Sequence, residues 1–517
     1  MAEYVLGIDA GTESIRAGVY DRTGRNLAFG TSENKNIHRH PGWGEQSIEQ
    51  WDRSLVEAIN KAVKESGVDP KEIAGIGLDG TSCTVVFLDE KGKPLRDAVM
   101  WMDIRATKEA EEIANSGDDA LKYIGFGNLS PEWFPCKTLW IKRNEPETYK
   151  KAKTIFEQTD WLAWRLTGEV TANINTSTVR WFYNQDEGGL PKSLYEKIGL
   201  GDIFEKLPSR VVQLGEVVGG LTTEMAESTG LTEGIPIAGG GADAYMGVVG
   251  VNALRAGQLA LITGSSQLHI GVADREVHTR GLFGSFPGAL VPGLQVIEAG
   301  QISTGSVVKW FLTNFLNTEI TEEAKKRGGS VYDVLNERAE QIAPGSDGLL
   351  VLEHWQGNRT PWVDPNSRGV IRGLTLSHGP AHIYRAMMEG VVYGTKVIID
   401  RMEQEKFKID EIIACGGATQ SDLWMRIHAD VTGKPITIPE EQQAVSLGSA
   451  IAGAVGAGMY KDLKEAASQM VRVAKRVEPD PEKTKIYAEY VRQYDATYNA
   501  LKDESKRLVN YVHELSN

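Results

Sequence analysis

The first thirty residues carry the pattern that decides the fold. Residues 4–9 read YVLGID, residues 10–14 read AGTES, and residues 15–21 read IRAGVYD. Mostly apolar runs bounded by Gly and Ser are typical of strands joined by a tight turn. A second turn at residues 22–25 (RTGR) leads into residues 26–30. The chain is therefore predicted to start with a three-stranded antiparallel meander.

The same pattern returns in the middle of the chain. Residues 258–263 (QLALIT) form a predicted strand, residues 264–266 (GSS) form a small-residue turn, and residues 268–272 form a second strand. We interpret this as a weak internal duplication, which predicts an α/β fold with two domains of similar plan. The expected domains are residues 1–252 and residues 253–517.

Other elements follow from the spacing of apolar residues. Helical spacing predicts a helix over residues 48–65, and apolar runs predict strands over residues 73–78, 85–88 and 235–238. Three glycines at residues 239–241 predict a turn directly before Asp243. Residues 479–517 are polar, with apolar residues at helical spacing, and predict a terminal helix.

Length, charge and cysteine content exclude several classes of protein. A chain of 517 residues predicts about two to four domains. The net charge of −14 repels phosphodiester backbones, so nucleic acid is not expected as a partner. Neither an apolar run of about 18 residues nor a signal peptide is visible, so no membrane association is expected. Three widely spaced cysteines without a C-x-x-C pair indicate neither a zinc site nor a disulfide framework, and they favour a reducing cytoplasm.

Two glycine-rich stretches place an aspartate beside a predicted strand end. In residues 7–14 (GIDAGTES), turn amides and hydroxyls could hold phosphate, and the Asp9 carboxylate could hold a hydrated Mg²⁺. In residues 239–244 (GGGADA), the backbone could approach a ligand closely, and Asp243 could act as a general base toward a hydroxyl. An ordinary hairpin turn and a helix-capping aspartate are the respective alternatives.

The most specific motif lies in the second half of the chain. Residues 369–374 read GVIRGL, and after seven residues the chain continues at residues 382–389 with HIYRAMME. With the glycine-rich stretches, this motif resembles the C-terminal signature of the FGGY carbohydrate kinases, a family of the actin–hexokinase superfamily. An earlier family signature is met in part, because Lys137 and Trp140 keep its K-x-x-W spacing.

The resemblance implies a fold, a reaction and a set of site residues. It implies two actin/hexokinase-like (ribonuclease H-like) domains that flank a central cleft for nucleotide and sugar, with ATP and Mg²⁺ as cofactors. It implies that Asp243 is the catalytic base and that Asp9 is the aspartate associated with Mg²⁺. The implied nucleotide-contacting positions are Thr12, Arg16, Thr263, Gly264, Gly305, Lys309, Gly416, Gly417 and Ser421.

The sugar is expected between the two domains. Residues 79–82 end a predicted strand, where open α/β sheets expose ligand-binding loops. Residues 101–105 (WMDIR) supply an aromatic face and a carboxylate. Core packing of Trp101 and a structural ion pair of Arg105 are the alternative for this segment. The expected sugar contacts are Thr81, Ser82, Trp101, Asp103, Asp243 and Glu298.

The motifs also bear on which sugar is phosphorylated. Residues 79–84 (DGTSCT), 298–301 (EAGQ) and 354–359 (HWQGNR) are similar to ribulokinases, which implies phosphoryl transfer to the C5 hydroxyl of D- or L-ribulose. Residues 176–181 depart from the L-ribulokinase segment that carries a substrate-contacting lysine, and residues 478–483 are similar to autoinducer-2 kinases. Kinases of xylulose, erythritol, glycerol or the autoinducer-2 precursor are therefore alternatives, and so is a catalytically silent sugar-binding sensor on the same fold. A homodimer is an open alternative to a monomer.

Overall fold

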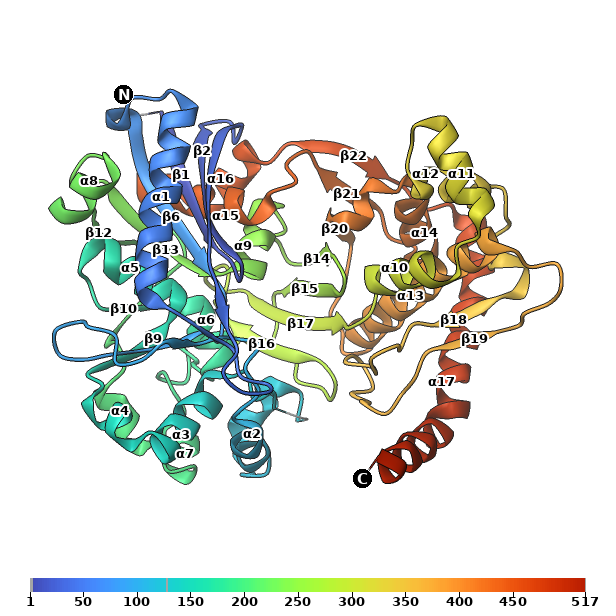
Figure 1. Ribbon diagram of the computed structural model, residues 1–517, viewed down its shortest axis with the longest axis horizontal. Coiled ribbons are helices and arrows are strands. Elements are labelled where there is room, and N and C mark those ends of the chain that lie inside the picture. Colours follow the sequence, from blue (N-terminus) through green and yellow to red (C-terminus); the bar gives the residue numbers. More distant parts are fainter. Residues whose placement is uncertain (1–2, 127–128, 517) are drawn as a thin grey trace.

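Two mixed β-sheets form the centre of the molecule, and helices cover their faces (Figure 1). The structure is a computed structural model that describes residues 3–126 and 129–516. Met1, Ala2 and Asn517, the outer ends of the two predicted domains, lie outside the described residues. In spatial order, the first sheet contains β12 (Val217–Gly220), β13 (Pro236–Ala242), β6 (Ile73–Gly80), β1 (Tyr4–Ala10), β2 (Ser14–Asp21) and β3 (Asn26–Glu33). The second contains β16 (Phe283–Pro287), β17 (Gln295–Gln301), β15 (Gln267–Ala273), β14 (Gln258–Thr263), β20 (Glu411–Gly416), β21 (Ile436–Pro439) and β22 (Val473–Val477).

Both sheets are built around the same unit. β1 pairs with β2 antiparallel and with β6 parallel, and β14 pairs with β15 antiparallel and with β20 parallel. The predicted meander is present as β1, β2 and β3. The predicted duplication and the two-domain α/β plan are therefore confirmed.

Smaller sheets flank these two. One has five strands in the order β4 (Asn36–Ile37), β5 (Glu45–Gln46), β8 (Ala98–Val99), β7 (Val85–Leu88) and β9 (Thr154–Glu157). Two further strand pairs are β10 (Thr171–Asn173) with β11 (Arg210–Val212) and β18 (Leu350–Leu352) with β19 (Val370–Arg372).

The helices fall into two groups along the chain. The first group is α1 (Ile48–Ser66), α2 (Thr107–Ala114), α3 (Phe134–Asn144), α4 (Pro146–Lys151), α5 (Gln158–Thr167), α6 (Ile174–Arg180), α7 (Lys192–Lys197), α8 (Thr223–Thr229) and α9 (Asp243–Gly250). The second is α10 (Gly305–Phe315), α11 (Thr318–Arg327), α12 (Val331–Glu340), α13 (Pro380–Gln404), α14 (Asp422–Thr432), α15 (Ala444–Gly456), α16 (Leu463–Met470) and α17 (Pro481–Ser516). Among the residues that the structure describes, no helix is long and apolar enough to cross a membrane.

Helix α1 shows how the local sequence sets its bounds. The Ser47 side chain accepts a hydrogen bond from the backbone N–H of Gln50 at the start of the helix, and Gly67 ends it at a φ of 68°. Apolar side chains at helical spacing, among them Trp51 and Leu55, are buried against the first sheet. The helix predicted over residues 48–65 is confirmed.

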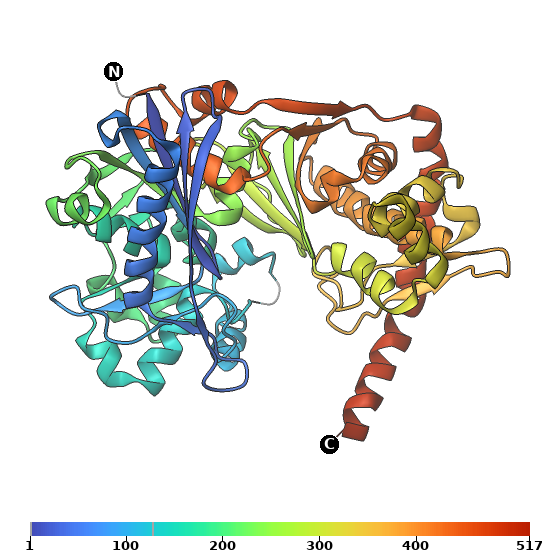
Figure 2. The ribbon, with the colours of Figure 1, turned by 45° about the horizontal axis from the view of Figure 1, so that its top comes forward.

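A helix from the second half of the chain covers the other face of the first sheet. Figure 2 shows α15 across the sheet from α1, and α15 packs against β1, β6 and β13. The contact requires glycine in the strands, because a Cβ at Gly77 would lie 1.8 Å from the backbone oxygen of Ser449 in α15. The division of the chain into residues 1–252 and 253–517 therefore stays a prediction, since α15 belongs in sequence to the second part.

One local prediction is wrong. The three glycines at residues 239–241 were expected to form a turn, but they continue β13 as far as Ala242. They permit close pairing of β13 with β6, because a Cβ at Gly240 would lie 1.7 Å from the backbone oxygen of Leu78. The pairing register shifts between Ala238 and Gly241, and this irregular stretch leads directly into Asp243 at the start of α9.

Candidate active site

Three carboxylates meet at one edge of the first sheet. Asp9 near the end of β1 is the register partner of Asp79 near the end of β6, and Asp243 follows β13 directly. Since β13, β6 and β1 are adjacent parallel strands, their carboxyl ends lie side by side. Asp79 is fully buried, and its Oδ2 accepts a hydrogen bond of 2.5 Å from Ser449 of α15. Its Oδ1 has no hydrogen-bond partner among the described residues.

The electrostatics of this edge favour a bound cation. Burial raises the pKa of Asp79 well above its usual value, and the charge of Asp9 raises it further. Burial also raises the pKa of Asp9, although a hydrogen bond with Asp79 and the charge of Arg16 oppose this. The buried Asp79, which has a free oxygen, and the half-buried Asp9 repel each other, and such a pair of carboxylates is suitable for a divalent cation.

The donor set fits Mg²⁺ rather than a cation that requires many protein ligands. Within residues 3–126 and 129–516, no group of three or more His, Cys, Asp or Glu side chains is arranged to hold a metal ion. Mg²⁺ keeps several waters and usually binds through one or two carboxylates and substrate phosphates. Asp9 was predicted for this role from the sequence but Asp79 was not, because only the parallel register of β1 and β6 brings the two together.

Asp243 has the environment of a general base. Burial raises the pKa of Asp243 to about 6, and the charge of Asp9 adds to this shift. The hydrogen bond from the backbone N–H of Ala244 and the charge of Arg180 act in the opposite direction. The Asp243 Oδ1 accepts a hydrogen bond of 2.6 Å from Ala244. A carboxylate with a pKa of about 6 is ionised at neutral pH but holds a proton better than an ordinary aspartate, as proton abstraction from a hydroxyl requires.

This pKa predicts how activity depends on pH. Because only ionised Asp243 can accept a proton, we expect kcat/KM to be constant near pH 8 and to fall with unit slope below about pH 6. The pH dependence of kcat/KM is measured from initial rates between pH 5 and pH 8.5. At each pH, the enzyme is first shown to remain folded. A profile that stays flat down to pH 5 would contradict the assignment.

The first glycine turn lies beside an aromatic side chain. The indole Nε1 of Trp101 donates a hydrogen bond of 2.9 Å to the hydroxyl of Thr12, and the Trp101 side chain is 38% exposed. Arg16 bonds to the side chain of Gln443, in the segment before α15. The structure thus brings the predicted sugar contact Trp101 next to the predicted phosphate contact Thr12.

The second glycine turn combines segments far apart in sequence. The Thr263 hydroxyl donates to the backbone oxygen of Cys415 at 2.8 Å and accepts from the backbone N–H of Ala418 at 3.0 Å. The backbone N–H of Gly305, where α10 begins, donates to the oxygen of Gly264 at 3.1 Å. Gly416 has a φ of 93°, in the left-handed region that favours glycine.

The remaining predicted nucleotide contacts surround this turn. Lys309 is exposed on α10, one helical turn after Gly305. Gly417 follows Gly416 directly and begins a short 3-10 helix. The Ser421 hydroxyl caps α14 and donates to the Asn336 side chain at 3.0 Å. Within the part of the chain that the structure describes, the Lys309 ammonium forms no hydrogen bond and no ion pair.

Two predicted sugar contacts already have protein partners. The Thr81 hydroxyl lies 2.7 Å from both the Thr84 hydroxyl and Gln158 Oε1. The Asp103 carboxylate is fully buried and accepts hydrogen bonds from Gly44 and from the guanidinium of Arg105. The ion pair between Asp103 and Arg105 is the structural alternative stated above for residues 101–105. The roles of Thr81 and Asp103 as sugar contacts stay predictions. Ser82 is partly exposed beside Thr81.

Glu298 lies in a polar cluster with two residues of the first domain. Arg180, the last residue of α6, donates to Glu298 at 3.0 Å, and the hydroxyl of Tyr245 donates to it at 2.7 Å. Burial alone would raise the pKa of Glu298, but Arg180 and Tyr245 outweigh it and hold the pKa below its usual value. Arg180 was missed from the sequence, where its segment was noted only as a departure from L-ribulokinases.

Glu298 and Arg180 line a cavity of about 290 Å³ between the two domains. The first domain contributes residues 129–133 and Arg180, and the second contributes β17 and a loop of residues 356–365. Tyr245, which donates to Glu298, follows Asp243 by two residues in α9, so the cavity and the carboxylate edge are neighbours.

Comparison with known proteins decides the family. The model of the N-terminal domain of the FGGY family of carbohydrate kinases matches residues 4–250, and the model of its C-terminal domain matches residues 259–457. The chain belongs to this family. It is therefore a phosphotransferase that acts on a sugar.

The similarity between this FGGY kinase and its relatives covers nearly the whole chain. It is 33% identical to the ribulokinase of Halalkalibacterium halodurans, over 98% of this chain and 97% of that protein. It is 31% identical to the human FGGY carbohydrate kinase domain-containing protein, over 94% of each chain. The structure of a xylulose kinase from Rhodospirillum rubrum matches with a TM-score of 0.86 and 25% identity, over 97% of this chain and 99% of that one. A Plasmodium falciparum glycerol kinase with ADP matches with a TM-score of 0.83 and 19% identity, over 96% and 98%, which shows a common fold.

A buried lysine of this FGGY kinase supports the loops of the site. Lys137 in α3 is fully buried, and its ammonium donates to the backbone oxygens of Cys83 at 2.6 Å and Met100 at 2.5 Å. These residues adjoin Ser82 and Trp101, so Lys137 positions both segments. The only sequence signal for it was the K-x-x-W spacing.

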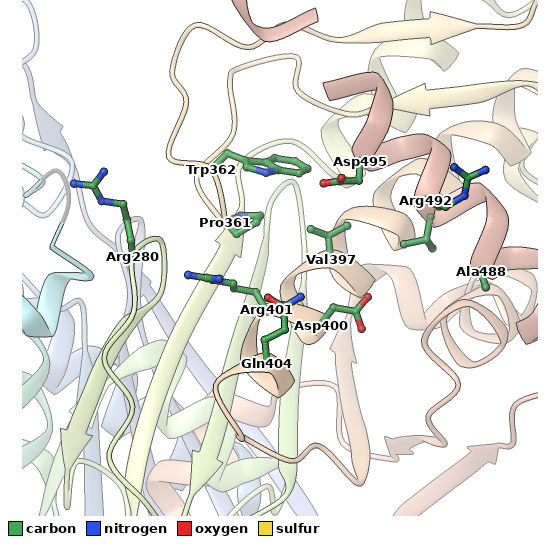
Figure 3. A pocket seen from close by; sticks show the side chains of 11 residues that line it. Arg280, Pro361, Trp362, Val397, Asp400, Arg401, Gln404, Ala488, Arg492 and Asp495 are labelled. Carbon is green, nitrogen blue, oxygen red and sulfur yellow. The ribbon is translucent and has the colours of Figure 1, made fainter. Parts of the chain in front are cut away.

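A larger cavity of about 670 Å³ lies away from the predicted residues. Figure 3 shows Arg280 on one side and α13 and α17 on the other, with Pro361 and Trp362 between them. None of the predicted site residues lines it.

Proposed function

We propose that this FGGY kinase transfers the γ-phosphate of ATP to the terminal C5 hydroxyl of a 2-ketopentose, specifically ribulose. The observation that carries the proposal is the position of Asp243. It follows β13 at the edge that carries Asp9 and Asp79, and Tyr245, two residues later, donates a hydrogen bond to Glu298 in the wall of a polar cavity.

The reaction follows from these groups. Asp243 accepts the proton of the C5 hydroxyl as that oxygen attacks the γ-phosphorus, and ADP leaves with the electrons of the broken P–O bond. Backbone amides around Gly11 and Gly264 bind phosphate oxygens. Asp9 and Asp79 would hold Mg²⁺, which neutralises charge on the phosphates. Positioning of the hydroxyl and exclusion of water then favour the sugar over water as acceptor.

The polar lining of the cavity supports a substrate longer than three carbons. Glu298, Arg180, Gln356 and Asn358 all line it. Glycerol, with three hydroxyls, can contact fewer of these groups than a five-carbon sugar can. A pentulose offers a carbonyl and four hydroxyls. The similarity to ribulokinases at 33% identity supports ribulose among the pentuloses.

Xylulose is the second candidate, because a xylulose kinase matches this fold with a TM-score of 0.86 at 25% identity. Xylulose and ribulose differ in the configuration of one hydroxyl, so the same cavity could be built for either.

We place the reaction in the cytoplasm, a reducing compartment that suits three widely spaced cysteines.

A panel of sugars tests the proposal. We expect kcat/KM for D- or L-ribulose to exceed that for xylulose, erythritol, glycerol and the autoinducer-2 precursor by at least about tenfold, measured by coupled release of ADP. The Asp243→Asn variant, purified in parallel, controls for contaminating kinases. If one of the other four sugars is preferred, the ribulose assignment is wrong. If none of these sugars is phosphorylated, the ribulose assignment is wrong as well.

A further inference from the structure

Two charged side chains that line the 290 Å³ cavity, Glu132 and Arg359, form no hydrogen bond and no ion pair with the residues that the structure describes. Arg359 lines the cavity from the second domain and is exposed. Its Cδ lies 3.5 Å from the position that a Cβ at Gly300 would take, two residues after Glu298 in β17, and both side chains line the same cavity. Within the part of the chain that the structure describes, the guanidinium forms no hydrogen bond and no ion pair. Arg180, by contrast, is already engaged with Glu298.

The loop that carries Arg359 is firmly held. Two backbone hydrogen bonds of 2.9 Å join Asn358 and Asp364 across its base. The Thr360 hydroxyl accepts a hydrogen bond from the backbone N–H of Gly300 at 3.3 Å, two residues after Glu298 in β17. The loop therefore cannot shift freely relative to Glu298.

A buried polar network fixes the start of the same loop. The imidazole of His354 bonds to the Ser367 hydroxyl at 2.7 Å and to the Tyr494 hydroxyl at 3.2 Å. Tyr494, in α17, also donates to Glu353 at 2.7 Å. Burial lowers the pKa of His354 to about 3, so the imidazole is neutral and the network stays intact at physiological pH.

The far side of the loop is anchored by aromatic stacking. The rings of Trp362 and Tyr498 lie 3.9 Å apart, nearly parallel. Figure 3 shows the Trp362 ring beside Asp495 of α17, and both side chains line the 670 Å³ cavity. An unpaired guanidinium on a segment anchored at both sides is pre-organised for a ligand, because little conformational entropy is lost on binding.

We propose that Arg359 is a further substrate-binding residue, which the second domain contributes to the sugar and which hydrogen-bonds oxygen atoms at the end of the ketopentose remote from Asp243. The inference rests on the proposed function, since it takes the C5 hydroxyl to be at Asp243. The C2 carbonyl and the C1 hydroxyl are then the atoms within the sugar that can accept from Arg359. A guanidinium only donates, so it suits a carbonyl oxygen.

Steady-state kinetics of Arg359→Gln and Arg359→Lys test this. We expect Arg359→Gln to raise KM for ribulose at least about tenfold, while KM for ATP and the sugar-independent hydrolysis of ATP change by less than about twofold. Arg359→Lys keeps the charge but not the planar pair of donors, and we expect an intermediate KM. Calorimetric titration with ribulose in the absence of nucleotide should show the same order of affinity.

Arg280→Gln is the matched control. It removes an exposed positive charge of the second domain that lines the 670 Å³ cavity instead, and we expect wild-type kinetics. A KM for sugar within about twofold of wild type in Arg359→Gln, or equal changes in both variants, would overturn the inference. If the wild-type enzyme prefers another sugar, the ribulose proposal fails separately, and the same comparison on that sugar decides the role of Arg359.

Discussion

Replacement of Asp243 by asparagine is expected to lower kcat by about 10²–10⁴-fold, the usual contribution of general-base catalysis. The amide has the size of the carboxylate but cannot accept the proton of the sugar hydroxyl. Coupled ADP release with saturating sugar and ATP measures the effect. A variant that keeps more than about a tenth of the wild-type kcat would remove Asp243 from this role.

The same variant should not be less stable than the wild type. The pKa of Asp243 is raised from 3.8 to about 6 in the folded state, so its ionised form opposes folding. This penalty is absent below about pH 3.8, develops between the two values and is complete above pH 6. At pH 7.5 we therefore expect an equal or higher Tm for Asp243→Asn, with nucleotide affinity retained. Asp462→Asn, which keeps a capping side chain at the start of α16, should leave kcat and Tm unchanged.

Loss of the Arg180 side chain is expected to damage both stability and sugar binding. Arg180→Met leaves Glu298 largely buried without its counter-charge, and removal of one partner from a fully buried pair costs about 3–5 kcal/mol. Because both side chains here keep 12–15% exposure, we expect a smaller loss of about 2 kcal/mol in the free energy of unfolding. KM for the sugar should rise at least about tenfold, as measured by ADP release.

A double variant separates the two effects. When both members of a buried ion pair become apolar, stability is often restored. Arg180→Met combined with Glu298→Met should therefore regain most of the lost stability in urea unfolding, but it should not regain the KM for sugar. Recovery of both properties would show that the pair is only structural.

The fold was largely predictable because its decisive signal is local. The alternation of apolar residues around residues 10–14 and 264–266 specifies a strand, a turn and a strand without reference to the rest of the chain. The glycines at residues 239–241 misled the prediction, because the same residues that permit a turn also permit close pairing of β13 with β6. Local composition could not distinguish these two uses of glycine.

The candidate site was less predictable, because its chemistry depends on partners distant in sequence. Asp79 joins Asp9 only through the register of two parallel strands. Thr81 looked available for a sugar hydroxyl until Gln158 proved to be its partner. Sequence shows which side chains are polar, but it does not show which of them are already hydrogen-bonded within the protein.

The position of α15 also bears on how the chain is made. The first sheet is complete in sequence once β13 has been synthesised, yet the helix that covers one of its faces begins at Ala444. On the ribosome, that apolar face and the partner of Asp79 are both missing for about the next two hundred residues. The first domain can therefore reach its final structure only near the end of translation. The half of the chain that is made first therefore waits for most of the other half.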